Sequence, residues 1–284
     1  MLISDVIDKI VASSGDVMMG EKIDPATTRD IVIHGSTDKE CTGIVTTCFA
    51  SVDVIREAAR RGANLIVSHE SIFWNHMHNE PLADWPTFKE KAALLDEYGI
   101  TVWRYHDHIH AGIPVGPDGA LRDGIFYGLA VELGWEDYLV PDQLSCMDYV
   151  IPATPVREVA EHVVRCAGVT GCRIIGDADA PVSRIRVPYH LFGNEDLPAI
   201  RALEFDGIDC YIAMECVDFT ASEYVRDASQ LGHPRAIVNL GHFNGEEPGM
   251  KFIVGWLTDL FEGALPVSFV QSGDVFTFVT LPSE

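Results

Sequence analysis

Three histidines lie within five residues in the segment RYHDHIHAGIP, residues 104–114. They are His106, His108 and His110, and the whole chain has only 11 histidines. Imidazole groups bind transition metals and transfer protons near neutral pH. Exposed loops and edge strands also carry histidines without a function, so the segment alone leaves both interpretations open. A metal site or an acid–base site needs further partners elsewhere in the chain.

Two other segments carry residues of the same chemical type directly after a short apolar run. These are His69 and Glu70 after NLIVS (64–68), and His242 with Glu246 after RAIVNL (235–240). The three-histidine segment likewise follows GITVWRY (99–105). Each run predicts a buried strand, and the carboxyl ends of parallel strands meet at one edge of an open α/β sheet. We therefore expect the three segments to converge at such an edge.

The donor atoms of these segments favour a metal. Imidazole nitrogens combined with carboxylate oxygens suit zinc, iron, manganese or nickel. His242 and Glu246 are four residues apart, which would place them on one face of a helix. Gly241 and Gly245 favour a turn instead, so we expect both side chains to project from a loop that leads into a helix.

The conformation of the three-histidine segment decides which of its side chains face the site. If the segment is extended, His106, His108 and His110 face one way and Asp107 the other. His106 or His108 then supports the ligands or transfers protons to a substrate.

The predicted elements explain how these segments are positioned. Residues 43–47 and 64–68 predict two strands, and Ser51 is a suitable N-cap for a helix between them. This strand–helix–strand order indicates a parallel sheet. The alternation continues with a helix over 89–97 and the strand over 99–105.

A second α/β stretch fills the middle of the chain, and Pro141 and Pro234 mark its ends. We therefore expect two α/β domains, the second inserted into the first. Residues 1–140 together with 235–284 would form the domain with the metal site, and residues 141–234 the inserted domain.

Composition and charge exclude several classes of protein. The chain has 284 residues, 47% of them hydrophobic and 22% charged, which is typical of a globular protein with a sizeable core. The formal net charge of −23 repels phosphate backbones, so a nucleic acid polymer is not an expected partner. No apolar run is long enough for a membrane helix, and the first residues lack the pattern of a signal peptide.

The seven cysteines indicate a reducing compartment. Their number is odd and none forms a C-x-x-C pair, which favours free thiols in the cytoplasm. Cys48 follows the strand over 43–47, where packing is its default role and proximity to the site the alternative. His76 and His78 would lie in a solvated loop or line the mouth of the site.

Taken together, these segments resemble the NIF3-like (DUF34) family, the dinuclear metal centre proteins that are also described as GTP cyclohydrolase 1 type 2 homologues. GANLIVSHESIF is similar to the strand and ligand loop of the family, and NLGHFNGEEPG to a later ligand segment. LPVSFVQSGDVF is similar to the end of the family pattern. The resemblance is good at both ends of the chain and poor in the middle.

Carried over by position, the resemblance implies His69, His242 and Glu246 as metal ligands. Glu70 stands where the family has a second histidine, and His110 stands where it has an aspartate. The family motif at this point is H-x3-D, and His106 matches its histidine. The exchange keeps three imidazoles and two carboxylates, so His69, Glu70, His110, His242 and Glu246 form the predicted ligand set.

The resemblance implies an α/β fold of two related halves with mixed sheets, and two divalent transition-metal ions per chain. A site with one ion or none is the alternative, because aspartate can bridge two metals whereas imidazole normally does not. A homo-oligomer, in the family often a hexameric ring, is also implied.

Two functions fit these residues. In the first, a metal-dependent hydrolase activates water at the site and acts on a small molecule, such as a nucleotide, a cyclic amidine or a phosphoester, with His106 or His108 transferring protons. In the second, the protein is not catalytic and serves as a metal-binding, metal-delivery or protein-interaction factor. The same ligands serve both functions, so the sequence does not separate them.

Overall fold

The computed structural model describes residues 1–75, 82–115, 119–141, 143–188 and 190–279. The chain divides into two compact units. The first unit comprises residues 1–128 and 247–272, and the second comprises residues 129–246 and 273–284. Helices α5 (Gly124–Leu133) and α9 (His242–Leu260) continue from one unit into the other.

A five-stranded mixed sheet forms the centre of the first unit, in the order β14-β4-β5-β6-β3. The first four strands run parallel to one another, and β3 pairs antiparallel with β6 at the edge. The bounds are β3 (Val32–His34), β4 (Ile44–Thr47), β5 (Leu65–Ser68), β6 (Thr101–Arg104) and β14 (Val267–Phe269). Strands β4, β5 and β6 are buried throughout.

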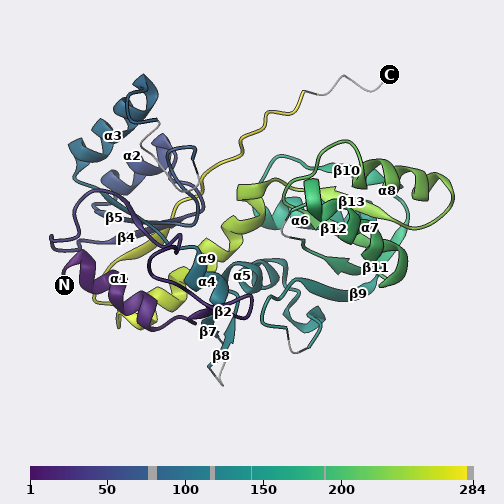
Figure 1. The fold of residues 1–284 in the computed structure, drawn as a ribbon, viewed down its shortest axis with the longest axis horizontal. Coiled ribbons are helices and arrows are strands. Elements are labelled where there is room, and N and C mark those ends of the chain that lie inside the picture. Colours follow the sequence, from purple (N-terminus) through teal and green to yellow (C-terminus); the bar gives the residue numbers. More distant parts are fainter. Residues whose placement is uncertain (76–81, 116–118, 142, 189, 280–284) are drawn as a thin grey trace. The chain divides into compact units, whose positions relative to one another are not determined.

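Helices cover both faces of this sheet, as Figure 1 shows. On one face lie α2 (Val52–Arg60) and α3 (Pro86–Tyr98), which enclose an apolar core with Val45, Ile66 and Val102. On the other lie α1 (Ile3–Ala12) and the later part of α9, where Thr46 donates a hydrogen bond to the carbonyl of Met250 at 2.7 Å. Ser51 caps α2 as expected, because its side chain accepts a hydrogen bond from the amide of Val54.

Two short hairpins and a short helix complete the first unit. The hairpins are β1 (Val17–Met18) with β2 (Glu21–Lys22), and β7 (Ile113–Val115) with β8 (Ala120–Arg122). Between β6 and β7 lies helix α4 (Asp107–Ala111), which carries the histidine segment.

The second unit also has a five-stranded mixed sheet, in the order β10-β13-β12-β11-β9. The three central strands are parallel, and both edge strands are antiparallel to their neighbours. The bounds are β9 (Asp148–Pro155), β10 (Arg173–Gly176), β11 (Pro181–Arg186), β12 (Cys210–Ala213) and β13 (Ala236–Asn239). The α/β architecture with mixed sheets is therefore confirmed.

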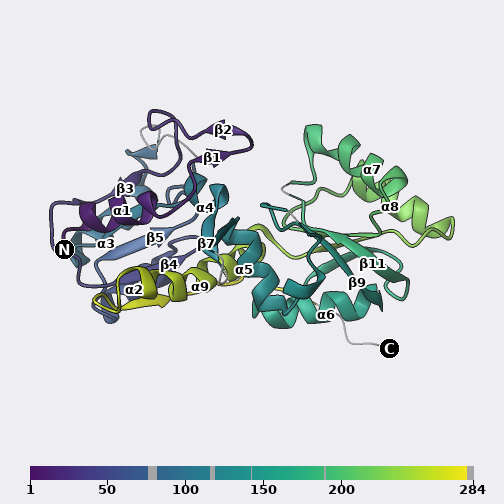
Figure 2. The ribbon, with the colours of Figure 1, turned by 90° about the horizontal axis from the view of Figure 1, so that it is seen from below.

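Figure 2 shows helices on both faces of the second sheet. On one face, α7 (Asp196–Phe205) and α8 (Ala221–Gln230) pack on Tyr211, Ala213 and Ile237. On the other lies α6 (Val156–Ala167), which follows β9 directly. Two 3-10 helices, Glu136–Tyr138 and Gly193–Glu195, lie in the connecting segments.

The units divide the chain at different positions from the expected domains. The strand predicted over 235–240 was assigned to the domain of His69, but β13 lies between β12 and β10 in the second sheet. The boundaries therefore fall after residues 128 and 246, in place of 140 and 234. As a result, the three strands that precede the candidate ligands do not share one sheet: β5 and β6 are in the first, and β13 is in the second.

Among the described residues, no helix combines the length and the apolarity that crossing a bilayer requires.

Candidate metal centre

His69 and Glu70 lie at the carboxyl edge of the first sheet, directly after β5. The backbone there continues the pairing between β4 and β5: the amide of His69 donates to the carbonyl of Thr47 at 3.1 Å, and the amide of Glu70 to that of Cys48 at 2.8 Å. The loop is therefore fixed by the sheet. Cys48 is fully buried, and its carbonyl helps to hold this loop.

The histidine segment after β6 is helical, so the arrangement described for an extended segment does not apply. The carboxylate of Asp30 accepts hydrogen bonds from the backbone amides of His106, Asp107 (2.8 Å) and His108 (2.9 Å). These amides belong to the first turn of α4, which has no internal acceptors for them. Burial raises the pKa of Asp30, but hydrogen bonds from His108 and His106 bring it below its usual 3.8.

The helical conformation separates the three histidines. His106 and His110 are four residues apart and lie on one face, with ring centroids 5.0 Å apart. His108 points elsewhere, and its Nδ1 forms an ion pair with Asp30. His108 therefore contacts the carboxylate that holds α4, and its ring is not part of the group formed by the other histidines.

His69, His106 and His110 form a compact group of rings, which we call the first-unit cluster. The rings of His69 and His106 are stacked with centroids 4.5 Å apart, and the centroids of His69 and His110 are 5.0 Å apart. One ligand atom from each residue lies within 4.8 Å of the others. The sequence predicted two of the three as ligands and placed His106 in a supporting or proton-transfer role.

Each ring of the first-unit cluster has an acceptor at its Nδ1 atom. His69 Nδ1 is 3.1 Å from the carbonyl of Tyr105, His106 Nδ1 is 3.0 Å from Asp107, and His110 Nδ1 is 2.8 Å from Asp123. A hydrogen on Nδ1 makes Nε2 the basic nitrogen of a neutral ring. This is the arrangement of metal-binding histidines, whose second nitrogen donates to a carboxylate or carbonyl.

The two carboxylates are themselves anchored. Asp107 accepts hydrogen bonds from the side chain of Thr28 at 3.0 Å and from Arg29, through its backbone at 2.9 Å and its Nε at 2.7 Å. Asp123 also accepts from the amides of Ile125 and Phe126, at the start of α5. Asp30 and Asp123 were not predicted from the sequence. Asp123 could have been found as a capping residue before a helix, whereas Asp30 has no signal near the histidines.

Glu70 lies beside the cluster in a buried ion pair. Its Oε2 is 2.9 Å from Arg104 Nη2, and its Oε1 is 3.7 Å from His106 Nε2. Both side chains are buried, and burial lowers the pKa of Arg104 although Glu70 opposes that shift. One oxygen of Glu70 therefore balances the guanidinium, and the other faces the histidines.

The protonation state of His106 suits metal binding. Burial lowers its pKa well below the usual 6.5, and the neighbouring His69 and His110 lower it further. The ring is therefore neutral at physiological pH, as a ligand must be. Three neutral imidazoles with oriented Nε2 atoms fit a transition metal of the zinc type.

The other two predicted ligands lie in the second unit. His242 and Glu246 belong to the first turns of α9, so the expectation that they project from a loop is wrong. His242 Nε2 is 3.2 Å from Glu246 Oε2, as the four-residue spacing on a helix allows. His242 Nδ1 is 2.9 Å from Glu215, a residue that was not predicted from the sequence. His76 and His78 lie outside the described residues.

Comparison with known proteins gives the family and the fold. The profile described as Duf34/NIF3 (NGG1p interacting factor 3) matches residues 30–274. No curated protein matches the chain.

Solved structures of similar fold include a hypothetical protein from Staphylococcus aureus, SA1388, with 14% identity and a TM-score of 0.69 over 98% of this chain and 99% of that one. A Bacillus cereus protein related to NIF3 has 16% identity and a TM-score of 0.68 over the same shares. TTHA1606 from Thermus thermophilus has 16% identity and a TM-score of 0.62, over 97% of this chain and 100% of that one.

The profile match extends over most of the sequence, from before the first-unit cluster to beyond β14. At such low identity the solved structures show the fold alone, and that fold is the one that the profile leads us to expect. The chain belongs to the Duf34/NIF3 family.

Proposed function

We propose that the protein is a metal-dependent hydrolase whose metal ion is held by His69, His106 and His110. The observation that supports this is the convergence of three rings at the carboxyl edge of a parallel sheet, each with its own acceptor at Nδ1. A divalent ion there would supply Lewis-acid activation of water. Three protein ligands leave a coordination position for a further molecule.

Glu70 is the residue of this chain that we propose as the proton acceptor. Its Oε1 faces His106, while Arg104 holds the other oxygen, so the carboxylate is oriented toward the cluster. A positioned carboxylate of this kind takes a proton from water that attacks a substrate. We retain nucleotides, cyclic amidines and phosphoesters as the proposed substrate classes.

Metal analysis tests the site. Protein purified without chelator should contain bound transition metal, and His110→Ala should lower the content by one ion per chain while circular dichroism stays unchanged. His34→Ala is the matched control, because His34 lies in the same unit and pairs with Asp96 away from the cluster. Unchanged metal content in His110→Ala would show that the cluster is not the site.

Activity tests the reaction. The metal-loaded protein should hydrolyse at least one of the proposed substrate classes, and His110→Ala should not. Glu70→Gln should retain the metal and lose turnover, because the amide cannot accept the proton. Full turnover in Glu70→Gln would contradict the role of this carboxylate.

The non-catalytic alternative has one observation in its favour. His69 has no exposed surface and His106 is only 8% exposed, which suits a held ion better than an open reaction site. If the loaded protein turns over none of the three substrate classes, metal binding or delivery becomes the proposed function.

Location and assembly are part of the same proposal. All seven cysteines are described and none of them forms a disulfide, which supports the cytoplasm as the compartment. A homo-oligomer, such as a hexameric ring, is proposed from membership of the family, and light scattering of the purified protein tests it.

A further inference from the structure

The helices of the second unit cover one face of its sheet only in part. Asp148 of β9, Arg186 of β11 and Tyr211 of β12 are register partners in neighbouring strands, so their side chains lie side by side on that face. Helix α7 packs over Tyr211, which is 1% exposed. The side chains of Arg186 and Asp148 are 35% and 22% exposed. This face is therefore covered at β12 and open toward β9.

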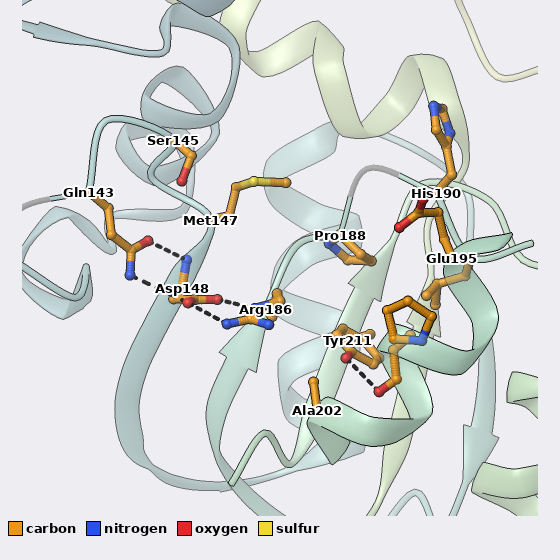
Figure 3. Close-up of a pocket in the computed structure, with 13 residues that line it drawn as sticks. Gln143, Ser145, Met147, Asp148, Arg186, Pro188, His190, Glu195, Ala202 and Tyr211 are labelled. Carbon is orange, nitrogen blue, oxygen red and sulfur yellow. Dashed lines mark hydrogen bonds and ion pairs between the residues drawn. The ribbon is translucent and has the colours of Figure 1, made fainter. Parts of the chain in front are cut away.

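A pocket of about 500 Å³ lies on this partly open face. The three register partners line it, together with residues of α7 such as Pro198. Figure 3 shows the ion pair of Asp148 and Arg186 on one side of the pocket and Glu195 on the other, with Pro188 between them. The volume is that of a site for a small molecule, and all of the lining residues belong to the second unit.

Much of the wall of this pocket is apolar. Met147 precedes β9, Pro188 follows β11 and Pro198 lies in the first turn of α7, and Leu191 and Ala202 also line the pocket. An apolar ring system would leave water by packing among these side chains. A rigid ring also loses little conformational entropy when it binds. The wall therefore favours a ligand with a rigid apolar body.

Arg186 supplies hydrogen-bond donors at the polar side of the pocket. Its Nε is 2.5 Å from Asp148 Oδ1, and its Nη2 is 2.7 Å from Asp148 Oδ2. A guanidinium has five N–H donors, and this ion pair uses one on each of two nitrogens. Among the described residues, no hydrogen bond from the third nitrogen, Nη1, is present. A ligand in the pocket therefore meets donors that need an acceptor.

The charges around Arg186 favour a neutral acceptor. Asp148 already balances the guanidinium, and the carboxylate of Glu195 lines the same pocket, so a negative charge on the ligand gains little. The net charge of −23 also repels anions. A cationic group would meet the donors of Arg186 with donors of its own. A carbonyl oxygen avoids both conflicts.

We propose that this pocket binds a small neutral molecule that joins a rigid apolar ring system to a carboxamide or lactam group. The carbonyl oxygen accepts a hydrogen bond from Arg186 Nη1, and the ring packs among Met147, Pro188 and Pro198. None of the lining residues is a ligand of the first-unit cluster, so the proposal goes beyond the hydrolase and does not rest on it.

Three probes of one shape test the chemical class of the ligand. They are 2-naphthamide, which is neutral, 2-naphthoate, which is an anion, and 2-naphthamidine, which is a cation. Isothermal titration calorimetry with the full-length protein should give 2-naphthamide an affinity about 10-fold higher than that of either ion, the factor expected from one hydrogen bond. Equal or tighter binding of either ion would overturn the proposal, as would a lack of binding by all three probes.

Two variants and a control locate the binding site. Arg186→Met keeps a long side chain without the donors and should lower the affinity for 2-naphthamide by about 10-fold. Pro198→Trp fills the pocket from the exposed start of α7, leaves the ion pair in place and should abolish binding. Arg184→Met is the control, because Arg184 lies on the same strand, is exposed and does not line the pocket.

The comparison of these variants decides the outcome. Circular dichroism should show the same fold in all three, and Pro198→Trp tests the pocket even if the loss of Arg186 unfolds the unit. Unchanged affinity for 2-naphthamide in Pro198→Trp would overturn the proposal. An equal loss of affinity in Arg184→Met and Arg186→Met would also overturn it, because the effect would then come from charge in general and not from the donors in the pocket.

Discussion

At the scale of single residues, Asp123 illustrates how one carboxylate serves both a ligand and a helix. Its Oδ2 is 2.8 Å from His110 Nδ1, and its Oδ1 accepts hydrogen bonds from the amides of Ile125 and Phe126. The first contact orients a ring of the metal centre, and the second satisfies backbone donors at the start of α5. Two substitutions separate these roles.

Asp123→Ser should weaken metal binding without a large loss of stability. Serine is a good N-cap and keeps an acceptor for α5, but it is too short to hold His110. Loss of such an orienting group typically lowers metal affinity by about 10- to 100-fold. Zinc titration and thermal unfolding measure the two effects.

Asp123→Ala is the matched comparison. It should weaken zinc binding to the same extent and also lower the free energy of unfolding by about 1 kcal/mol, because the cap is lost. If the serine variant binds zinc as tightly as the unchanged protein, Asp123 does not orient the ligand.

The residues also show what the sequence could and could not predict. His69, His110, His242 and Glu246 were found because each follows an apolar run that predicts a strand. Glu215, which contacts His242, follows such a run too, in DCYIAMEC, so the same rule would have found it. It was missed because it stands alone in the sequence, and only the pairing of β12 with β13 brings it to His242.

At the scale of elements, local signals predicted strands β4, β5, β6 and β13 and helices α2 and α3, and non-local contacts decided what was missed. Ser51 capped α2 as expected, because the cap and the helix are adjacent in the sequence. Helix α4 was missed, since its N-terminal amides are held by Asp30, which is 76 residues from His106. The sheet that includes β13 was also missed, because four buried residues in a row fit the centre of either sheet equally well.

Helix α3 carries a buried lysine that makes the stability of the first unit dependent on pH. Lys91 is only 4% exposed, its Nζ donates to the carbonyl of Ile72 at 2.7 Å, and it lies over the ring of Phe49. Burial lowers its pKa from 10.5 to about 7. Between these two values the unfolded chain binds a proton that the folded chain does not, so the free energy of unfolding rises with pH there.

Comparison with Lys91→Met should expose this dependence. Relative to that variant, the unchanged protein should gain stability as pH rises from about 7 toward 10, by up to about 1.4 kcal/mol per pH unit. Below that range the difference should be constant. Urea unfolding at a series of pH values measures it.

Lys89→Met provides the control for the same helix. Lys89 is 59% exposed and pairs with the exposed Asp84, so its removal should leave the pH profile unchanged. Parallel profiles for the unchanged protein and Lys91→Met would mean that Lys91 stays protonated in the folded state.

At the scale of the whole molecule, the two units repeat one plan. Each has a five-stranded mixed sheet with parallel strands in it, and each presents histidines where those strands end. The resemblance to the family implied related halves, and the two sheets agree with that implication. The prolines did not predict the boundaries of the units. Both boundaries fall inside helices, α5 and α9, where the sequence has no signal of a domain boundary.

Hydrogen exchange should show the response of the first unit to zinc. Zinc should slow exchange in residues 107–111 of α4, because binding at His110 stabilises the folded state against opening. His110→Ala should abolish this response, whereas His34→Ala should keep it. Equal exchange in α4 with and without zinc would contradict the site proposed for the first-unit cluster.

The tethering of α4 has a consequence for how an ion is chosen. Asp30, Asp107 and Asp123 fix the helix and two of the histidine rings through contacts that do not involve a metal. An incoming ion would therefore find these side chains already ordered, and little conformational entropy would be lost on binding. A rigid cage of this kind cannot expand to suit a larger ion or rearrange for a different coordination geometry. Selectivity in the first unit would then be set by the protein scaffold, before any metal is present, and not by the intrinsic affinity of imidazole for each ion.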